Sequence, residues 1–160
     1  MKPSARNASH SGLIAALYVL LTLLSAAFGL DKGAIQLRLS EAMTILPCLT
    51  SAAVPGLFLG CLLANLLCGA LPVDLLVGSL ATLLGALGTR ALRNHRYLAC
   101  LPPICANTLL IPPVLCYAYG IRQAIPLLML GVGAGEAVSC GLLGQALYTL
   151  LRRRGFGTSE

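Results

Sequence analysis

The chain has 160 residues, of which 58% are hydrophobic and 10% are charged. Soluble domains carry about 25% charged residues, so this composition excludes a soluble globule and is typical of a membrane protein. Eleven basic and five acidic residues give a net charge of +6, but the basic residues lie at the ends of apolar runs. They form no continuous basic stripe, which argues against nucleic-acid binding.

The apolar runs predict an all-α protein with six membrane-spanning helices in one domain, residues 1–160. About 20 residues cross the ~30 Å of bilayer hydrocarbon. The runs lie at about residues 13–30, 35–53, 56–71, 73–92, 98–119 and 124–151. The third run is short, and the connections are only a few residues long. This pattern predicts a compact helical bundle without a linker.

The positions of Lys and Arg predict that both termini lie in the cytoplasm. In this orientation the inner side carries most of the basic residues, as the positive-inside rule requires. The inner residues are Lys2, Arg6, Arg90, Arg93, Arg96, Arg152, Arg153 and Arg154, and the outer ones are Lys32, Arg38 and Arg122. The polar residues within the apolar runs then lie between the outer surface and the middle of the bilayer.

Polar residues inside the apolar runs are the candidate binding residues. A charged side chain at the bilayer centre costs roughly 2.5 to 3.5 kcal/mol, so a membrane protein that keeps one usually needs it for binding or transport. The set is Arg38, Glu41, Asn65, Asp74, Ser79, Thr82, Asn107 and Glu136. It suits a small, flat, polar ligand with several hydrogen-bond donors. A simpler alternative for Arg38 and Glu41 is a buried ion pair that only sets helix register.

The two glutamates differ in their expected partners. Arg38 precedes Glu41 by three residues, so the two share a helix face. Glu136 follows the glycine-rich run GVGAG, and its own helix has no basic residue before Arg152. A buried carboxylate needs a bonding partner. We therefore predict that Glu136 is the better acceptor for the donors of a ligand, with Glu41 as the alternative.

Small residues recur every four positions at the start of the first helix, at Ala8, Gly12 and Ala16. Such a ridge lets helices approach closely, either inside the bundle or against a partner protein.

The seven cysteines show no CxxC and no Cys/His zinc spacing, so we interpret them as packing residues and predict no cofactor or metal. The sequence also lacks the motifs GxxxxGK[ST], HExxH and GxSxG, so we predict neither an ATP site nor an enzyme.

Five segments of the sequence resemble the QueT family of queuosine-precursor transporters. They are RLSEAMTILP, SAAVPGLFLGCLLANLL, DLLVGSLATLLGALGTRAL, PPICANTLLIPPVL and GVGAGEAVSCGLLG. The resemblance extends over residues 13–151. It implies a six-helix S component of an energy-coupling factor (ECF) transporter, which captures queuine or another 7-deazaguanine from outside.

The resemblance also implies partners. Import would need a transmembrane T component and two cytoplasmic ATPases, and the small residues Gly12, Ala15 and Ala16 are implied to contact the T component. Two alternatives remain at this point. The chain is an S component for another vitamin or nucleobase, or it is a membrane-embedded enzyme with Glu41 or Glu136 as general base.

Overall fold

The computed structural model describes residues 5–30 and 36–156, and these residues form helices and their connections without any strand. The predicted all-α class is therefore confirmed. The α-helices are α1 (Ala5–Ala27), α2 (Ala53–Leu67), α3 (Pro72–Ala91), α4 (Leu101–Tyr117), α5 (Ile125–Glu136) and α6 (Gly144–Arg153). Two segments have other helical geometry: the 3-10 helix η1 (Leu39–Cys48) and the π-helix η2 (Ala137–Leu143).

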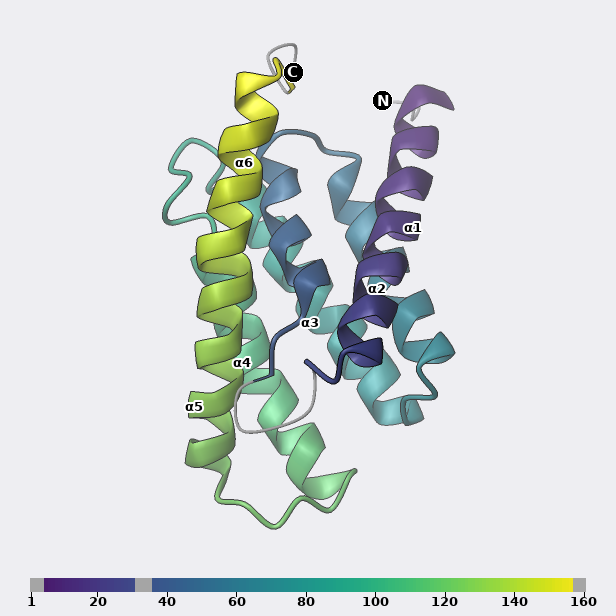
Figure 1. Cartoon of the computed structure of the whole chain (residues 1–160), viewed down its shortest axis with the longest axis vertical. Coiled ribbons are helices and arrows are strands. Elements are labelled where there is room, and N and C mark those ends of the chain that lie inside the picture. The colour runs from purple at the N-terminus through teal and green to yellow at the C-terminus, as the bar shows by residue number, and fades with distance from the viewer. Residues whose placement is uncertain (1–4, 31–35, 157–160) are drawn as a thin grey trace.

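The helices run up and down along the long axis of the molecule (Figure 1). α1 begins at the same end of the bundle at which α6 ends, and the connection from α3 to α4 also lies there. We term this the arginine-rich end. Besides Arg6 at the start of α1, its arginines are Arg90, Arg93, Arg96, Arg152, Arg153 and Arg154. The connections from α2 to α3 and from α4 to α5 lie at the opposite end.

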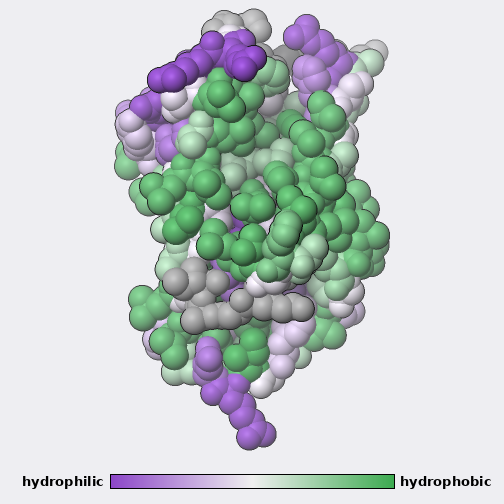
Figure 2. Space-filling view, viewed as in Figure 1, coloured by the Kyte–Doolittle hydropathy of each residue, from purple (hydrophilic) through white to green (hydrophobic). Residues whose placement is uncertain are grey.

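The surface of the bundle fits a lipid environment. Three helices are long and apolar enough to cross a membrane: Ala5–Ala27, Pro72–Ala91, and the continuous helix Ile125–Arg153, which joins α5, η2 and α6. α2 and α4 are apolar but shorter. Large apolar side chains point outward, and Figure 2 shows an apolar middle with hydrophilic residues at both ends. So large an apolar surface marks contact with a membrane.

The second predicted span, residues 35–53, is not an α-helix in its described part. Its helical residues Leu39–Cys48 form the 3-10 helix η1. A 3-10 helix rises about 2.0 Å per residue, against 1.5 Å in an α-helix, so this segment extends further for its length. Side chains three residues apart eclipse one another in a 3-10 helix. Glu41, Thr44 and Pro47 accordingly share one face, and all three are buried.

The small-residue ridge of α2 packs against α1. A Cβ atom at Gly60 would lie 2.8 Å from the Cβ atom of Tyr18 and 3.1 Å from the Cα atom of Ala15. α3 and α4 meet in the same way, because a Cβ atom at Gly85 would lie 2.8 Å from the Cα atom of Pro103. Close backbone approach of this kind is typical of helix packing in lipid.

The predicted orientation of the chain rested partly on two basic residues, Lys2 and Lys32, that lie outside the described residues.

Candidate functional site

Two glutamates from distant parts of the chain lie together in the core of the bundle. Glu41 in η1 is 1% exposed, and Glu136 at the end of α5 is 6% exposed. One carboxyl oxygen of each and the Sγ atom of Cys140 all lie within 4.8 Å of one another. Tyr18 from α1 and Asn107 from α4 complete the group. We term these five residues the carboxyl cluster.

Glu136 has a hydrogen-bond donor on each carboxyl oxygen. The Asn107 Nδ2 atom donates to Oε1 at 2.8 Å. The Cys140 thiol, one helical turn further along the chain, donates to Oε2 at 3.0 Å. Both oxygens therefore already have donors, although Glu136 was predicted to be the better acceptor for the donors of a ligand. That prediction rested on the absence of basic residues in the same helix and did not take account of neutral donors, namely an amide from α4 and a thiol four residues away.

Only one of the two carboxyl oxygens of Glu41 has a hydrogen-bond donor among the described residues. The Tyr18 hydroxyl donates to its Oε1 atom, so the hydrogen bond comes from α1 and not from the predicted partner Arg38. Its Oε2 atom is buried and has no hydrogen-bond partner within the described part of the chain. Leaving a buried polar group unsatisfied costs about 1–3 kcal/mol. Glu41 is thus the member of the carboxyl cluster that is best placed to accept a ligand donor.

Cys140 also connects the two glutamate-bearing segments. Its thiol lies 3.3 Å from the Thr44 hydroxyl and 3.4 Å from the backbone oxygen of Glu41. Thr44 in turn donates to the Glu41 backbone oxygen at 2.6 Å. Cys140 therefore belongs to the polar site, although the sequence pattern had predicted a packing residue. All seven cysteines are free thiols.

Glycine and a π-helical turn bring η1 and α5 together. A Cβ atom at Gly135 would collide with the backbone oxygen of Gln36, so only glycine fits there. Gln36 leads into η1, and this contact therefore positions Glu41 next to Glu136. The π-helix Ala137–Leu143 begins directly after Glu136. π-helical turns within α-helices are frequent at functional sites.

A cavity of about 690 Å³ lies toward the end opposite the arginine-rich end. None of the five cluster residues lines it, but Arg38, three residues before Glu41, does. This volume is in the range of about 300–1,000 Å³ that is usual for small-molecule sites. Thr22 and Ser25 line it from α1, one and two turns beyond Tyr18. The other polar lining residues are Gln36, Arg38, Asn65, Asp74, Tyr119 and Gln123.

The predicted site residues therefore separate into three groups. Arg38, Asn65 and Asp74 line the cavity. Glu41, Asn107 and Glu136 belong to the carboxyl cluster. Ser79 and Thr82 are buried and belong to neither group, because their hydroxyls donate to backbone oxygens of α3, at 2.6 Å and 3.0 Å.

Asp74 is held at the cavity rim by a tyrosine. The Tyr119 hydroxyl donates to the Asp74 Oδ2 atom at 2.8 Å and accepts a hydrogen bond from the backbone nitrogen of Leu71 at 3.3 Å. Burial raises the pKa of Tyr119, and the hydrogen bond to the Asp74 carboxylate raises it further. The hydroxyl therefore stays protonated, and remains a donor, at neutral pH.

Three site residues, Tyr18, Cys140 and Tyr119, were not predicted from the sequence. For Tyr18 there was a usable signal, because a buried tyrosine hydroxyl in the middle of an apolar run needs a partner. For Cys140 the signal was its spacing of four residues from Glu136, which places both on one helix face. Tyr119 follows α4 and carried no such signal.

The three small residues implied to contact a partner protein lie on different faces of α1. Ala15 is 6% exposed and packs against Gly60 of α2. Gly12 and Ala16 are exposed, and so is Ala8. Gly12 also lines a groove of about 530 Å³ between the start of α1 and the start of α2. The ridge of Ala8, Gly12 and Ala16 thus lies on the outside of the bundle, beside this groove.

Comparison with known families agrees with the motifs in the sequence. The model of the family described as QueT transporter matches residues 8–153, nearly the whole chain. Comparisons with curated proteins and with solved structures found no match. The matched range contains the whole carboxyl cluster and every residue that lines the cavity. The chain therefore belongs to the QueT transporter family.

Proposed function

We propose that the chain is the substrate-binding S component of an ECF importer and that it captures a queuosine precursor, a 7-deazaguanine. The single observation that carries this proposal is the buried, unpartnered Oε2 atom of Glu41, three residues along the chain from Arg38, which lines a cavity of ligand size. Membership of a transporter family supports a role in transport. Since the sequence has no ATP-binding motif, the energy would come from a T component and two ATPases.

The chemistry of a 7-deazaguanine matches this arrangement. Its edge carries an N1–H group and an exocyclic amine, and a carboxyl group can accept both. Glu41 supplies the acceptor in this proposal, and Glu136 holds Asn107 beside it. In the cavity, Asn65 and Arg38 offer donors to the ring carbonyl. Arg38 and Asp74 additionally give the cavity rim one charge of each sign.

The same arrangement would select against other bases. An adenine-like edge has a ring acceptor where guanine has N1–H, so it would turn an acceptor toward Glu41. A site with buried polar groups rejects ligands that leave those groups unpaired, often by several orders of magnitude in affinity. This argument favours 7-deazaguanines and guanine over adenine-like bases.

We further propose six membrane passes with both termini in the cytoplasm and the cavity on the outer side. The charge distribution supports this orientation. Of the described basic residues, Arg38 and Arg122 lie toward the cavity end, while the arginine-rich end carries the remainder. The exposed ridge of Ala8, Gly12 and Ala16 then lies toward the cytoplasmic side, where a T component can bind it.

The proposal is tested by ligand-dependent thermal stabilisation of the purified protein. The panel contains queuine, its nitrile and aminomethyl precursors, guanine, adenine and several vitamins. We expect the three 7-deazaguanines to raise the melting temperature and to be recovered chemically unchanged. Stabilisation by a vitamin alone would contradict the proposed substrate class, and recovery of an altered ligand would indicate an enzyme.

A further inference from the structure

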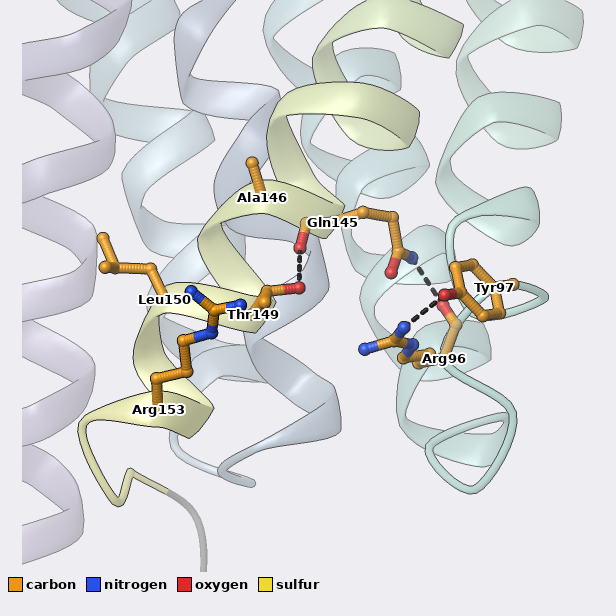
Figure 3. A pocket seen from close by; sticks show the side chains of 7 residues that line it. All are labelled: Arg96, Tyr97, Gln145, Ala146, Thr149, Leu150 and Arg153. Atoms are coloured by element: carbon orange, nitrogen blue, oxygen red, sulfur yellow. Dashed lines mark hydrogen bonds between the residues drawn. The ribbon is translucent and has the colours of Figure 1, made fainter.

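A second hollow, of about 440 Å³, lies at the arginine-rich end (Figure 3). It is formed by α6 and by the connection that follows α3. Its polar lining consists of Arg96, Tyr97, Gln145, Thr149 and Arg153. The substrate-binding proposal makes no use of this hollow. It is separated from the cavity by the length of the bundle, since the two lie at opposite ends of the helices.

Both walls of this hollow are held in place by contacts. The Gln145 Nε2 atom donates to the backbone oxygen of Arg96 at 2.6 Å, which ties α6 to the connection. The Arg96 guanidinium donates to the Tyr97 hydroxyl and lies 4.4 Å from the centroid of that ring. The ring of Tyr148 lies 5.9 Å from the same guanidinium. Two aromatic rings and a glutamine therefore orient Arg96.

The charge in this hollow is positive and is not neutralised by its own lining. Arg96 and Arg153 supply two guanidinium groups, and no lining residue is acidic. The acidic residues that the structure describes are Glu41 and Glu136 in the carboxyl cluster and Asp74 at the cavity rim. Guanidinium groups bind phosphate oxygens with charge-assisted hydrogen bonds, so this hollow suits a phosphate-bearing ligand.

The lining also has an acceptor without a donor. The Gln145 Oε1 atom is buried and has no hydrogen-bond partner among the residues that the structure describes. A phosphodiester group has no hydrogen-bond donor of its own at neutral pH, whereas a hydroxyl group next to the phosphate can donate to this oxygen. The preferred ligand therefore combines an anionic phosphate with a hydroxyl.

The hollow borders the apolar surface of the bundle. Leu150 lines it and is 55% exposed, and Leu98, which follows Tyr97, is 49% exposed. In Figure 2 the hydrophilic end of the molecule lies directly above the apolar middle. A ligand in this hollow would thus have its polar part among arginines and room for alkyl chains against leucines. Basic pockets at this level of a membrane protein bind lipid headgroups.

We propose that this hollow binds the headgroup of an anionic phospholipid, and that phosphatidylglycerol fits it best. Its phosphate lies between Arg96 and Arg153, its glycerol hydroxyls reach Gln145, and its acyl chains run along Leu150. The lipid holds the connection after α3 against α6. This site is independent of the substrate, so it stands or falls separately from the proposed transport role.

The proposal is tested by lipid titration of the purified full-length protein in detergent, with melting temperature as the readout. The lipids are phosphatidylglycerol, phosphatidic acid and phosphatidylcholine with identical acyl chains, and inorganic phosphate is tested alongside them. A ligand that binds only the folded state raises its stability. We expect phosphatidylglycerol to raise the melting temperature most, and phosphatidic acid less, because phosphatidic acid lacks the headgroup glycerol hydroxyls that reach Gln145. Phosphatidylcholine and inorganic phosphate should have little effect.

Two variants test whether the lipid binds in this hollow. Arg153 is exposed, so Arg153→Gln should fold, and it should weaken the apparent affinity for phosphatidylglycerol about tenfold, as expected when a charged hydrogen bond is lost. Arg93→Gln is the matched control, because Arg93 is exposed at the same end but does not line the hollow. Equal losses in both variants, equal stabilisation by phosphatidylcholine, or full stabilisation by inorganic phosphate would each overturn the proposal.

Discussion

The carboxyl cluster in the core and the arginine-rich end hold their ionisable groups in opposite environments. In the core, the carboxyl groups of Glu41 and Glu136 are buried and are bonded by neutral donors from three other positions. At the arginine-rich end, Arg96 and Arg153 line an open hollow and keep contact with the surface. A buried carboxyl group depends on every donor around it, whereas a charge at the surface is weakly coupled to its neighbours.

This difference has a consequence for recognition. The carboxyl cluster can distinguish ligands by the number and position of their donors, because each unmade hydrogen bond in the core is costly. The arginine-rich end distinguishes ligands mainly by their charge. Changes in the carboxyl cluster should therefore have large and specific effects, and changes at surface positions should have small ones.

The largest effect is expected at Gly135, whose close contact with Gln36 holds η1 against α5. In Gly135→Ala the new Cβ atom would collide with backbone, which no side-chain rotation relieves, so we expect a loss of about 3 kcal/mol of stability. Thermal unfolding and 7-deazaguanine binding should both show it. Gly141→Ala is the control, since a Cβ atom there meets nothing within 4 Å. Similar losses in the two variants would show that the contact does not matter.

A bulky residue on the exposed ridge of α1 should separate transport from binding. Gly12→Trp places a large side chain where no atom lies within 4 Å of a Cβ, so the bundle itself should be unaffected. We expect uptake by the assembled transporter to be abolished and 7-deazaguanine binding by the isolated chain to be unchanged. Ala15→Leu should instead lower the melting temperature, because Ala15 packs on Gly60. Loss of binding in Gly12→Trp would contradict a docking role for the ridge.

Removing the Tyr18 hydroxyl should weaken the carboxyl cluster without changing its shape. Tyr18→Phe leaves the Glu41 Oε1 atom without the donor that it has in the structure. We expect a loss of about 1–3 kcal/mol of stability, measured by thermal unfolding, and weaker ligand binding. An unchanged melting temperature and affinity would mean that Glu41 does not depend on this hydrogen bond.

The smallest effect is expected from the corresponding change at the cavity rim. Tyr119→Phe also removes a tyrosine hydroxyl from a carboxylate, here Asp74, but this hydrogen bond lies in an exposed environment. We expect a loss of less than about 1 kcal/mol, because water replaces the lost donor. A comparison of this variant with Tyr18→Phe tests whether burial determines how much stability is lost when a tyrosine hydroxyl is removed. A larger loss in Tyr119→Phe would refute that explanation.

Sequence patterns predicted the helical class. Six of the eight candidate polar residues are buried, whereas Arg38 and Asp74 are partly exposed. The patterns did not predict that residues 39–48 form a 3-10 helix, because hydropathy measures how apolar a run is and not how its backbone hydrogen-bonds. The hydrogen bond from Cys140 to Glu136 could have been predicted from the sequence, since it spans four residues of one helix. The Tyr18–Glu41 and Asn107–Glu136 bonds span 23 and 29 residues and depend on how the helices pack.

The most direct test of the recognition site compares Glu41→Gln with Glu136→Gln in calorimetric binding of a 7-deazaguanine. Glutamine keeps the shape of the side chain but can present a donor where Glu41 has its unpartnered acceptor. We predict that Glu41→Gln loses about 2 kcal/mol or more of binding free energy, roughly a 30-fold change, and that Glu136→Gln loses less. Parental affinity in Glu41→Gln together with abolished binding in Glu136→Gln would contradict the account.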